Sequence, residues 1–426
     1  MGCCGFSKLD ITPEIGCLLY GYVDDLVSES IHDPLFVNAF YFSDETKKAL
    51  MITADVCSIN TDFSEKMRKK IAEASSVPYE NIMLHAIHTH TGPNTDGNTG
   101  WGELDIDYCE NILLPKTLEA CLQAEANAKE AMVGISIGKS DVGVNRREQN
   151  LDNNIIFGQC AWGSYDPRMA VITFTDTDKN IIASLIYYTC HGTSAGKCTA
   201  ISRDFSGGMT DILAEYTSAP AAFFCGPEGD VGPRLPNGGT VGNIKDTEEL
   251  GKLAGKDAVK IFCSITDFVP LSFDITDRTL VLPLKDRITE NEAREIYNSF
   301  KNNYVNLDGQ KRNYALRVLD SYKNGYETKT HRKIHQTALR INDVIFAAFP
   351  YELFSDIALR INKAKEGYEV FSLSNTNGSA GYFPCNSEIS KGGYEVEMFL
   401  NLNIQPFADN ADWYLIKETL KTLEVF

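Results

Sequence analysis

Histidine is scarce in this chain, and its distribution is uneven. Only seven histidines occur in 426 residues, yet His85, His88 and His90 fall within six positions and are followed by a Gly-Pro pair. The apolar residues 81–87 predict a buried strand, and alternate residues of a strand share a face. We therefore expect His88 and His90 to point into one site at the end of this strand, and His85 to face the other way in a structural role.

A fourth histidine has the same setting. His191 directly follows a long apolar run that ends in Tyr188-Thr189-Cys190, and it precedes a glycine. Ligands in α/β proteins bind at the ends of strands, and imidazole is a common metal ligand. Two independent histidines in this position favour a metal site over ordinary core histidines.

Carboxylates follow two further predicted strands. Glu228 and Asp230 lie in the glycine-rich segment 226–232, and Glu352 follows the apolar residues 344–349. Capping of a turn or of a helix start also explains these carboxylates, because acidic residues favour helix N-termini. Two or three imidazoles with one carboxylate and a water would form a catalytic zinc site with an open position.

The segments that must position these residues alternate between strands and helices. The predicted strands are 36–42, 49–54, 81–87, 133–142, 169–173, 180–188, 221–225, 280–284, 344–349 and 370–373, and the predicted helices are 61–74, 107–129, 207–217, 246–265, 290–326 and 353–364. This pattern predicts an α/β fold with mixed β-sheets flanked by helices. Since no Pro/Gly/Ser-rich linker is visible, we expect residues 1–426 to form a single large domain, with 289–335 as a helical insertion broken near Asp308-Gly309.

The charge balance restricts the partners. The chain has 40 Lys+Arg against 58 Asp+Glu, a formal net charge of −18, which disfavours nucleic acid and anionic membrane. No apolar run approaches the length of a membrane span, and the N-terminus does not have the pattern of a secretory signal. The densest basic stretch, 311–333, predicts a solvated helix face, with a site for an acidic substrate group as the alternative.

The 12 cysteines are scattered and form no Cys-x-x-Cys pair, which indicates buried thiols in a reducing compartment. We therefore expect a cytoplasmic protein without stable membrane insertion. Its expected partner is a small-molecule substrate, and a homo-oligomer is left open.

Taken in order, the motifs resemble the catalytic domain of the neutral/alkaline non-lysosomal ceramidases, a family of zinc-dependent amidases. The resemblance covers nearly the whole chain. The matching segments are 5–13 with 21–22, His-Thr-His-Thr-Gly-Pro at 88–93, His-Gly-Thr-Ser at 191–194, 201–204, 228–231, Glu352, and 373–375 with 381–382 and 393–395.

The resemblance implies roles for individual residues. It implies Zn²⁺ ligation by His88, His191, Glu352 and Tyr382. It places His90 beside the zinc-bound water as a proton shuttle, and Arg146 and Tyr394 near the substrate and its developing oxyanion. From the same matching segments and the loop after the histidine motif, we expect substrate contacts from Trp101, Asp230 and Asn375.

Two departures from the family sharpen the expectation. Some members carry Ser where this chain has Gly232, so no side-chain nucleophile is available there and zinc-activated water is favoured. The family's longer members also have an immunoglobulin-like domain and a secretion signal, and without them the chain resembles a short, intracellular branch.

The substrate is expected to differ from ceramide. The loop at 94–103 is polar and rich in glycine, whereas ceramide calls for an apolar entrance. The expected function is zinc-dependent hydrolysis of an amide bond in a more soluble N-acyl compound. A zinc esterase or lactonase, and a non-catalytic protein that binds zinc or a ligand, are the alternatives.

Overall fold

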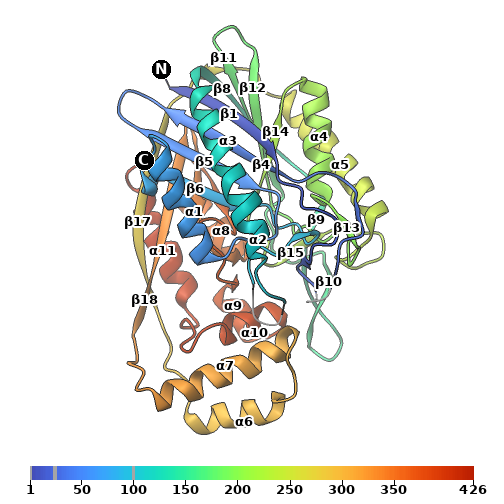
Figure 1. Ribbon diagram of the computed structural model, residues 1–426, viewed down its shortest axis with the longest axis vertical. Helices are drawn as coiled ribbons and strands as arrows, with labels where there is room; N and C mark the ends of the chain where they lie inside the picture. The colour runs from blue at the N-terminus through green and yellow to red at the C-terminus, as the bar shows by residue number, and fades with distance from the viewer. Residues whose placement is uncertain (1, 23–25, 98–100) are drawn as a thin grey trace.

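Two β-sheets pack against each other at the centre of the computed structural model, and helices cover their outer faces (Figure 1). The structure describes residues 2–22, 26–97 and 101–426. Between the sheets lies an apolar cluster to which both contribute, including Phe40, Phe174 and Phe224 from one sheet and Phe346 and Phe371 from the other. The predicted α/β class with mixed sheets and flanking helices is confirmed.

The larger sheet has the order β14-β12-β11-β8-β1-β4-β5-β6, with β16 paired to β8. Its strands are β1 (Cys3–Asp10), β4 (Phe36–Ser43), β5 (Lys48–Ala54), β6 (Ile82–Ala86), β8 (Lys129–Lys139), β11 (Arg168–Asp176), β12 (Ile181–Tyr188), β14 (Ala221–Cys225) and β16 (Val269–Pro270). The β5–β6 and β12–β14 pairs are parallel and the other pairs are antiparallel.

The second sheet has the order β17-β18-β19-β21, with β19 and β21 parallel. Its strands are β17 (Phe273–Pro283), β18 (His331–Ile341), β19 (Val344–Ala348) and β21 (Glu369–Leu373). A small sheet and three two-stranded pairs complete the strands: β10 (Ile155–Cys160), β9 (Gly143–Gln149) and β15 (Val231–Pro233); β2 (Leu19–Tyr20) with β7 (Gly92–Pro93); β3 (Ser30–Ile31) with β13 (Ala200–Ile201); and β20 (Glu352–Leu353) with β22 (Tyr382–Phe383).

Each outer face has its own helices and its own apolar cluster. Helices α1 (Thr61–Ala74) and α3 (Leu114–Ala126) cover the β4–β6 side of the larger sheet, and α4 (Phe205–Thr217) and α5 (Ile244–Phe262) cover the β12–β14 side. Helices α8 (Ser355–Ala364) and α11 (Ala411–Leu423) cover the second sheet. The shorter elements are η1 (Tyr79–Asn81), α2 (Ile106–Tyr108), the π-helical turn η2 (Cys109–Leu113), α9 (Asn386–Ile389) and α10 (Tyr394–Asn401).

Helix α1 illustrates why these segments are helical. The side chain of Asn60 accepts hydrogen bonds from the backbone of Asp62 and Phe63, which satisfies two of the four free N–H groups at the helix start. Phe63, Met67 and Ile71 recur every four residues and are buried against the sheet. No described helix is long and apolar enough to cross a membrane.

The larger sheet curls until its two ends approach each other. Although β6 and β14 are at opposite ends of the strand order, the Cys225 backbone N–H donates to His85 Nε2 at 2.9 Å. Thr53 Oγ1 on β5 likewise donates to the Phe223 carbonyl at 3.0 Å. The loops that follow β6, β12 and β14 therefore meet at one end of the molecule.

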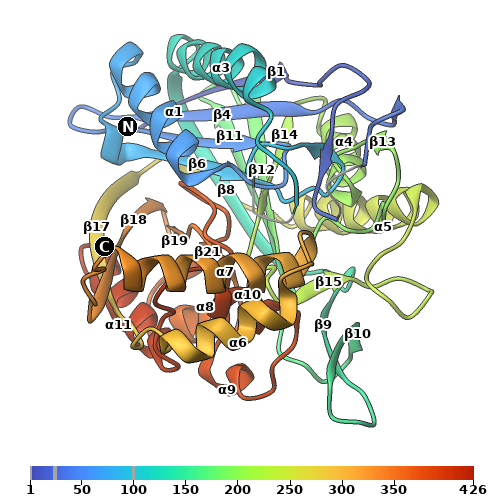
Figure 2. The ribbon, with the colours of Figure 1, turned by 60° about the horizontal axis from the view of Figure 1, so that its bottom comes forward.

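Two helices lie between β17 and β18 in the chain and extend from one end of the molecule (Figures 1 and 2). They are α6 (Glu290–Phe300) and α7 (Asn306–Lys323), which pack against each other, and α7 also contacts α10. The break between them lies at residues 301–305, ahead of the predicted position, and Gly309 is inside α7.

The prediction of one solvated helix face for the basic stretch is wrong. Arg332 and Lys333 lie in strand β18, and only the part up to Lys323 is helical. Within that part Arg317 is not free in solvent, because it donates to the carbonyls of Asn401 and Leu402. The stretch divides because the turn at 324–326 lies within it.

Candidate metal site and cavity

The loop after β6 turns His88 and His90 toward the same point. His88 has a φ of +67°, a value uncommon outside glycine and often associated with functional sites. Its backbone N–H donates to the Val56 carbonyl at 3.0 Å, and that of His90 donates to the Gly192 carbonyl at 3.0 Å. The two imidazoles meet with their Nε2 atoms 3.3 Å apart.

His191 reaches the same point from the end of β12. The two histidine loops form a parallel bridge between Thr89 and Gly192, and a Cβ atom at position 192 would lie 2.5 Å from the His88 carbonyl oxygen. Glycine at 192 is therefore required for the close approach of the loops. As a result His191 Nε2 lies 2.9 Å from His88 Nε2.

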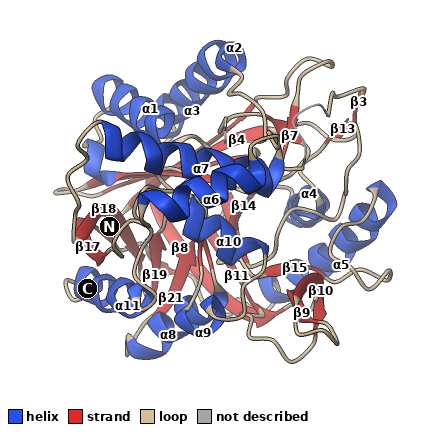
Figure 3. Ribbon diagram, turned by 90° about the horizontal axis from the view of Figure 1, so that it is seen from below, coloured by secondary structure: helices blue, strands red, loops and turns tan. Residues whose placement is uncertain are grey.

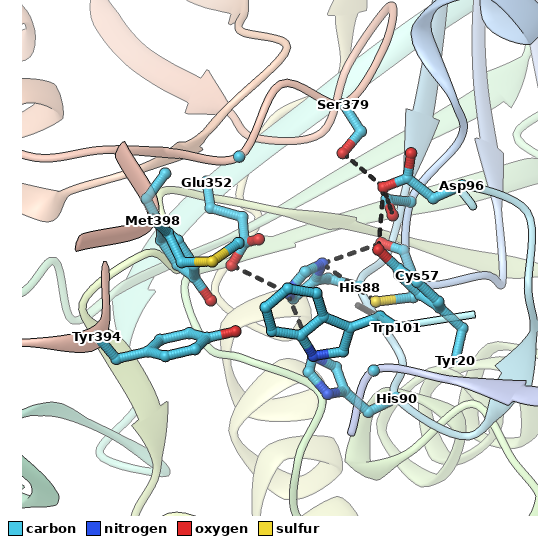
Figure 4. Close-up of a pocket in the computed structure, with 14 residues that line it drawn as sticks. Tyr20, Cys57, His88, His90, Asp96, Trp101, Glu352, Ser379, Tyr394 and Met398 are labelled. Carbon is cyan, nitrogen blue, oxygen red and sulfur yellow. Dashed lines mark hydrogen bonds and ion pairs between the residues drawn. The ribbon is translucent and has the colours of Figure 1, made fainter. Parts of the chain in front are cut away.

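Glu352 completes the group from the second half of the chain. It follows β19 and pairs, in strand β20, with Tyr382 of β22. Its Oε2 atom lies 3.3 Å from His88 Nε2 and 3.4 Å from His191 Nε2. Figure 4 shows Glu352 and His88 facing each other, with His90 beside them.

The orientation of the two rings suits a cation. His88 Nδ1 lies 2.9 Å from the Cys57 carbonyl, and His191 Nδ1 lies 2.9 Å from the Glu228 carbonyl. A carbonyl can only accept, so each Nδ1 is a donor and each Nε2 can present a lone pair. Glu352 Oε2 is buried and has no hydrogen-bond donor. These three acceptors fit a metal ion, and their ligand atoms all lie within 4.8 Å of one another.

The electrostatics point the same way. Burial raises the pKa of Glu352, but the charges of His88 and Arg146 lower it below its ordinary value, so the carboxylate stays ionised. Burial lowers the pKa of His88, yet Cys57 and Glu352 outweigh it and raise this pKa well above the usual range. Burial, followed by the charges of Arg146 and His88, lowers the pKa of His191 well below its usual range. Without a bound cation, His88 therefore holds a second proton on Nε2 facing Glu352, and a metal ion at this position would replace that proton.

Cys57 lies close to this group, and sequence reasoning missed it. Its Sγ atom is 3.6 Å from His88 Nδ1, and with His88 and His90 it forms a second set of potential ligand atoms. Burial raises the pKa of this thiol, which disfavours the thiolate that binds metals. The set of His88, His191 and Glu352 is therefore the better metal site. A single cysteine after a strand carries no pattern that could have revealed it.

Arg146 is held against the site by a buried ion-pair network. Its Nε donates to Glu395 Oε1 at 3.0 Å and its Nη2 to the Tyr382 hydroxyl at 3.1 Å. Arg147 shares the same Glu395 carboxylate. Glu395 is 1% exposed, and it was not among the predicted site residues although it directly follows Tyr394. Arg147 also pairs with Glu388, so two guanidinium groups and two carboxylates balance in charge, and the network holds the Arg146 side chain at the cavity wall.

Two cavities adjoin the metal ligands. The smaller, about 40 Å³, lies directly over His88 and Glu352. The larger, about 510 Å³, is walled mainly by apolar atoms. Both cavities are lined by Gly21, His90, Trp101, Tyr382 and Tyr394. Of the polar loop at 94–103, residues 98–100 lie outside the described residues.

The remaining predicted residues support the site from behind. Asn375 Nδ2 donates to Glu228 Oε1 at 2.7 Å and lies 3.0 Å from His88 Nδ1, so Asn375 packs behind the ring and does not line either cavity. Asp230 also lies outside both, because its carboxylate accepts from the backbone and hydroxyl of Ser355 at the start of α8. Asp230 thus holds the start of α8, and its predicted substrate contact stays a prediction.

His85 occupies the structural position predicted for it. Its Nε2 accepts from the Cys225 backbone, so its Nδ1 is protonated and donates to the Ser374 carbonyl at 2.9 Å. Burial lowers the pKa of His85 to about 3. The ring is a neutral link between β6, β14 and the loop after β21.

Comparisons with known proteins relate this fold to one family. The family model described as neutral/alkaline non-lysosomal ceramidase, N-terminal, matches residues 3–237, more than half of the chain. The neutral ceramidase of Pseudomonas aeruginosa is 21% identical in an alignment of 322 positions, which covers 68% of this chain and 47% of that protein. The chain therefore spans about half the length of the curated relative that it matches.

Solved structures show the same fold. A crystal structure of neutral ceramidase from Pseudomonas aeruginosa matches with a TM-score of 0.76 at 18% identity, over 99% of this chain and 73% of the other. A structure described as ceramidase complexed with C2 matches with a TM-score of 0.72 at 16% identity, over 98% and 74% of the two chains. At such low identity these matches establish the arrangement of the elements.

Proposed function

This chain belongs to the neutral/alkaline non-lysosomal ceramidase family, and on that premise we propose that it is a zinc-dependent hydrolase that cleaves the amide bond of linear N-acyl compounds. One observation carries the proposal: His88 Nε2, His191 Nε2 and Glu352 Oε2 converge within 3.4 Å of one another. They do so beside a cavity large enough for a substrate.

Two imidazole nitrogens and a carboxylate oxygen are a donor set that Zn²⁺ favours in catalytic sites. We infer that His88, His191 and Glu352 hold the ion, with the phenol of Tyr382 as a fourth ligand beside Glu352 in the paired strands β20 and β22. A zinc ion bound there would polarise the substrate carbonyl and lower the pKa of a water molecule to about 7.

His90 is the proton carrier in this proposal. Burial and the positive charges of His88 and Arg146 lower its pKa well below the usual range, so the ring is neutral and one of its nitrogens carries no proton. Its Nε2 lies 3.3 Å from His88 Nε2, and the ring also borders the cavity. His90 is thus placed to take a proton from the attacking water and to return it to the leaving amine.

Arg146 and Tyr394 would stabilise the negative charge that develops on the carbonyl oxygen. Both line the larger cavity, and the guanidinium group keeps its charge because burial is outweighed by Tyr382 and Glu395, which raise its pKa. Donors fixed in place before the reaction need no reorganisation as the charge forms. Trp101 and Phe157 pack around the Tyr394 ring and limit access of bulk water.

We further infer that residues 1–426 act as one catalytic domain, since the four ligands arrive from positions 88 to 382. The largely apolar walls of the cavity support an acyl group in the substrate. The net charge of −18 favours a dissolved substrate over one presented on an anionic membrane. A cytoplasmic location remains a prediction.

The experiment compares purified wild type with His88→Ala and with the control His331→Ala, which removes an exposed histidine on β18. Bound metal is measured by elemental analysis, and hydrolysis is measured on matched N-acyl amides and esters. We expect about one zinc per chain and amide hydrolysis in wild type and control, with both lost in His88→Ala. Zinc and activity retained in His88→Ala would refute the site. Hydrolysis of esters alone favours an esterase or lactonase, and zinc binding without hydrolysis favours a binding protein.

A further inference from the structure

The charge of the larger cavity is opposite to that of the protein. The chain has a net charge of −18, yet the described residues that line this cavity include no aspartate or glutamate. They include two permanent cations, Arg146 and Lys197. A cationic lining in a strongly acidic protein favours an anionic ligand, because it attracts negative charge while the rest of the protein repels it.

The two cations are engaged differently. Arg146 is bound to Glu395 and Tyr382 at the inner end of the cavity. Lys197 has no ion pair within the described part of the chain, and its only described partner is the face of Tyr22, 5.9 Å from Nζ to the ring centroid. Lys197 is exposed and therefore accessible to a ligand.

Lys197 stands on a turn that the fold holds in place. The buried Asp204 carboxylate accepts hydrogen bonds from the backbone N–H groups of Ser194 and Ala195, which precede Lys197 in the chain. Gly196 has a φ of +67°, and a Cβ atom there would lie 1.9 Å from the Gly242 carbonyl oxygen. This turn therefore presents Lys197 at a defined position on the cavity wall.

The contacts of Lys197 indicate which half of a bound substrate it would face. Tyr22 contacts both His90 and Lys197: its ring centroid lies 5.0 Å from that of His90 in a T-shaped pair, and Lys197 Nζ lies over its face. His90 is the residue proposed to protonate the leaving amine. These contacts relate the ammonium group of Lys197 to the part of the cavity where the leaving amine would lie.

We propose that Lys197 binds a carboxylate on the amine half of the substrate, so that the enzyme prefers N-acyl amino acids over neutral N-acyl amines. This inference rests on the proposed hydrolase function. The apolar walls would hold the acyl chain, and Lys197 would bind the carboxylate beyond the amide nitrogen. An ammonium group recognises such a charge as a point, without the paired geometry of arginine.

The test uses N-octanoyl derivatives of glycine, β-alanine and γ-aminobutyrate, each beside its primary carboxamide, which has the same shape without the charge. In wild type we expect kcat/KM for at least one carboxylate to exceed that of its carboxamide by about 10-fold. Lys197→Met should reduce this ratio to near 1, Lys197→Glu should reverse it, and Lys197→Arg should retain most of it. The spacer with the largest ratio measures the distance from the amide to Lys197.

Lys252→Met is the matched control, since it removes the same charge from an exposed position on α5 outside the cavity. It should leave the ratio as in wild type. A wild-type ratio near 1 for all three spacers, or a ratio unchanged in Lys197→Met, would overturn the inference.

If the hydrolase proposal fails, a binding measurement still tests the role of Lys197. If wild type cleaves no amide, the same compounds serve as ligands in calorimetry, where a carboxylate preference lost in Lys197→Met upholds carboxylate binding by Lys197. Equal binding of carboxylate and carboxamide refutes it.

Discussion

The floor beneath the two cavities and the rim of the larger one are built in different ways. The floor consists of the loops that carry His88, His191 and Glu352, and their backbone N–H groups donate to the carbonyls of Val56, Val231 and Gly381. The rim, formed by Lys197, Val241, Asn306 and Leu307, comes from surface turns and from the first residues of α7. Figure 3 shows α7 and α6 in front of the sheets at this end of the molecule.

This difference separates what fixes the chemistry from what selects the substrate. The floor is held by strands of both sheets, so its side chains have few alternative positions. The rim can be altered without moving a strand, because inserted segments and loops tolerate change better than the elements they connect. Substitutions in the floor should therefore reduce both stability and activity, whereas those in the rim should alter selectivity.

Gly192→Ala should have the largest effect, because it acts on the backbone of the floor. The added Cβ would lie 2.5 Å from the His88 carbonyl oxygen and 2.9 Å from Thr89 Cα, so the two histidine loops must separate. A misplacement of catalytic groups by about 1 Å can cost about 100-fold in activity. We therefore expect kcat/KM on N-acyl amides to fall by about that factor. Zinc affinity should fall with it, as measured by competition with a chelator.

The control for this substitution is Gly239→Ala, where the nearest atoms to an added Cβ are side-chain atoms of Asn237 at 3.5 Å or more. It should leave both quantities within a factor of two. If Gly192→Ala retains wild-type activity and zinc affinity, the close approach of the loops does not define the site.

His85→Gln tests the support beneath the floor through pH. The pKa of His85 is about 3 in the folded chain against an ordinary 6.5, so folding favours the neutral ring. Its contribution to stability is complete above pH 6.5 and is lost as the pH falls from 6.5 toward 3. At pH 5 the loss amounts to about 2 kcal/mol.

Urea unfolding of wild type and His85→Gln at pH 7 and pH 5 measures this contribution. The variant should be less stable at pH 7, because its hydrogen bonds to Ser374 and Cys225 are altered. The difference in unfolding free energy between the two proteins should shrink by about 2 kcal/mol at pH 5. A difference that is the same at both pH values would mean that His85 does not titrate on unfolding.

Much of the fold could be predicted because its core segments have strong local patterns. The helix at 61–74 and the strand at 221–225 were predicted with the bounds that the structure has. Strand β18 was missed because its outer half is charged, with His331, Lys333 and His335 exposed in alternation with less exposed neighbours. Basic residues on both sides of a turn resembled one helix face. Helices α10 and α11 and the β9–β10 hairpin were also absent from the prediction.

The site could be predicted only as far as each residue has a local signal. His88 and His191 stand at strand ends beside glycines, and that pattern is visible in the sequence. The convergence of their loops depends on the curl of a sheet in which β6 and β12 are far apart in strand order, and no single segment encodes it. Cys57 acts through such long-range packing and carries no pattern of its own, whereas Tyr22 and Glu395 lie in segments that match the family but were given no role.

Leu307→Ala should have the smallest effect, since it changes the rim alone. Leu307 is the second residue of α7, half-buried and part of the cavity wall. Shortening it removes about 1 kcal/mol of apolar contact from a long acyl chain, which corresponds to a rise of about 5-fold in KM. The kcat for the same substrate should stay within a factor of two, and an N-acetyl substrate, too short to reach the rim, should show neither change.

Leu316→Ala on the same helix is its control, because Leu316 is 36% exposed and lies outside the cavity lining. It should leave KM unchanged for both acyl lengths. If Leu307→Ala instead lowers kcat for the N-acetyl substrate, then α7 influences the ligands of the floor, and the separation between a fixed floor and an adjustable rim does not hold. If only the long-chain KM changes, the inserted helices set the acyl preference of a site whose chemistry is fixed by the sheets.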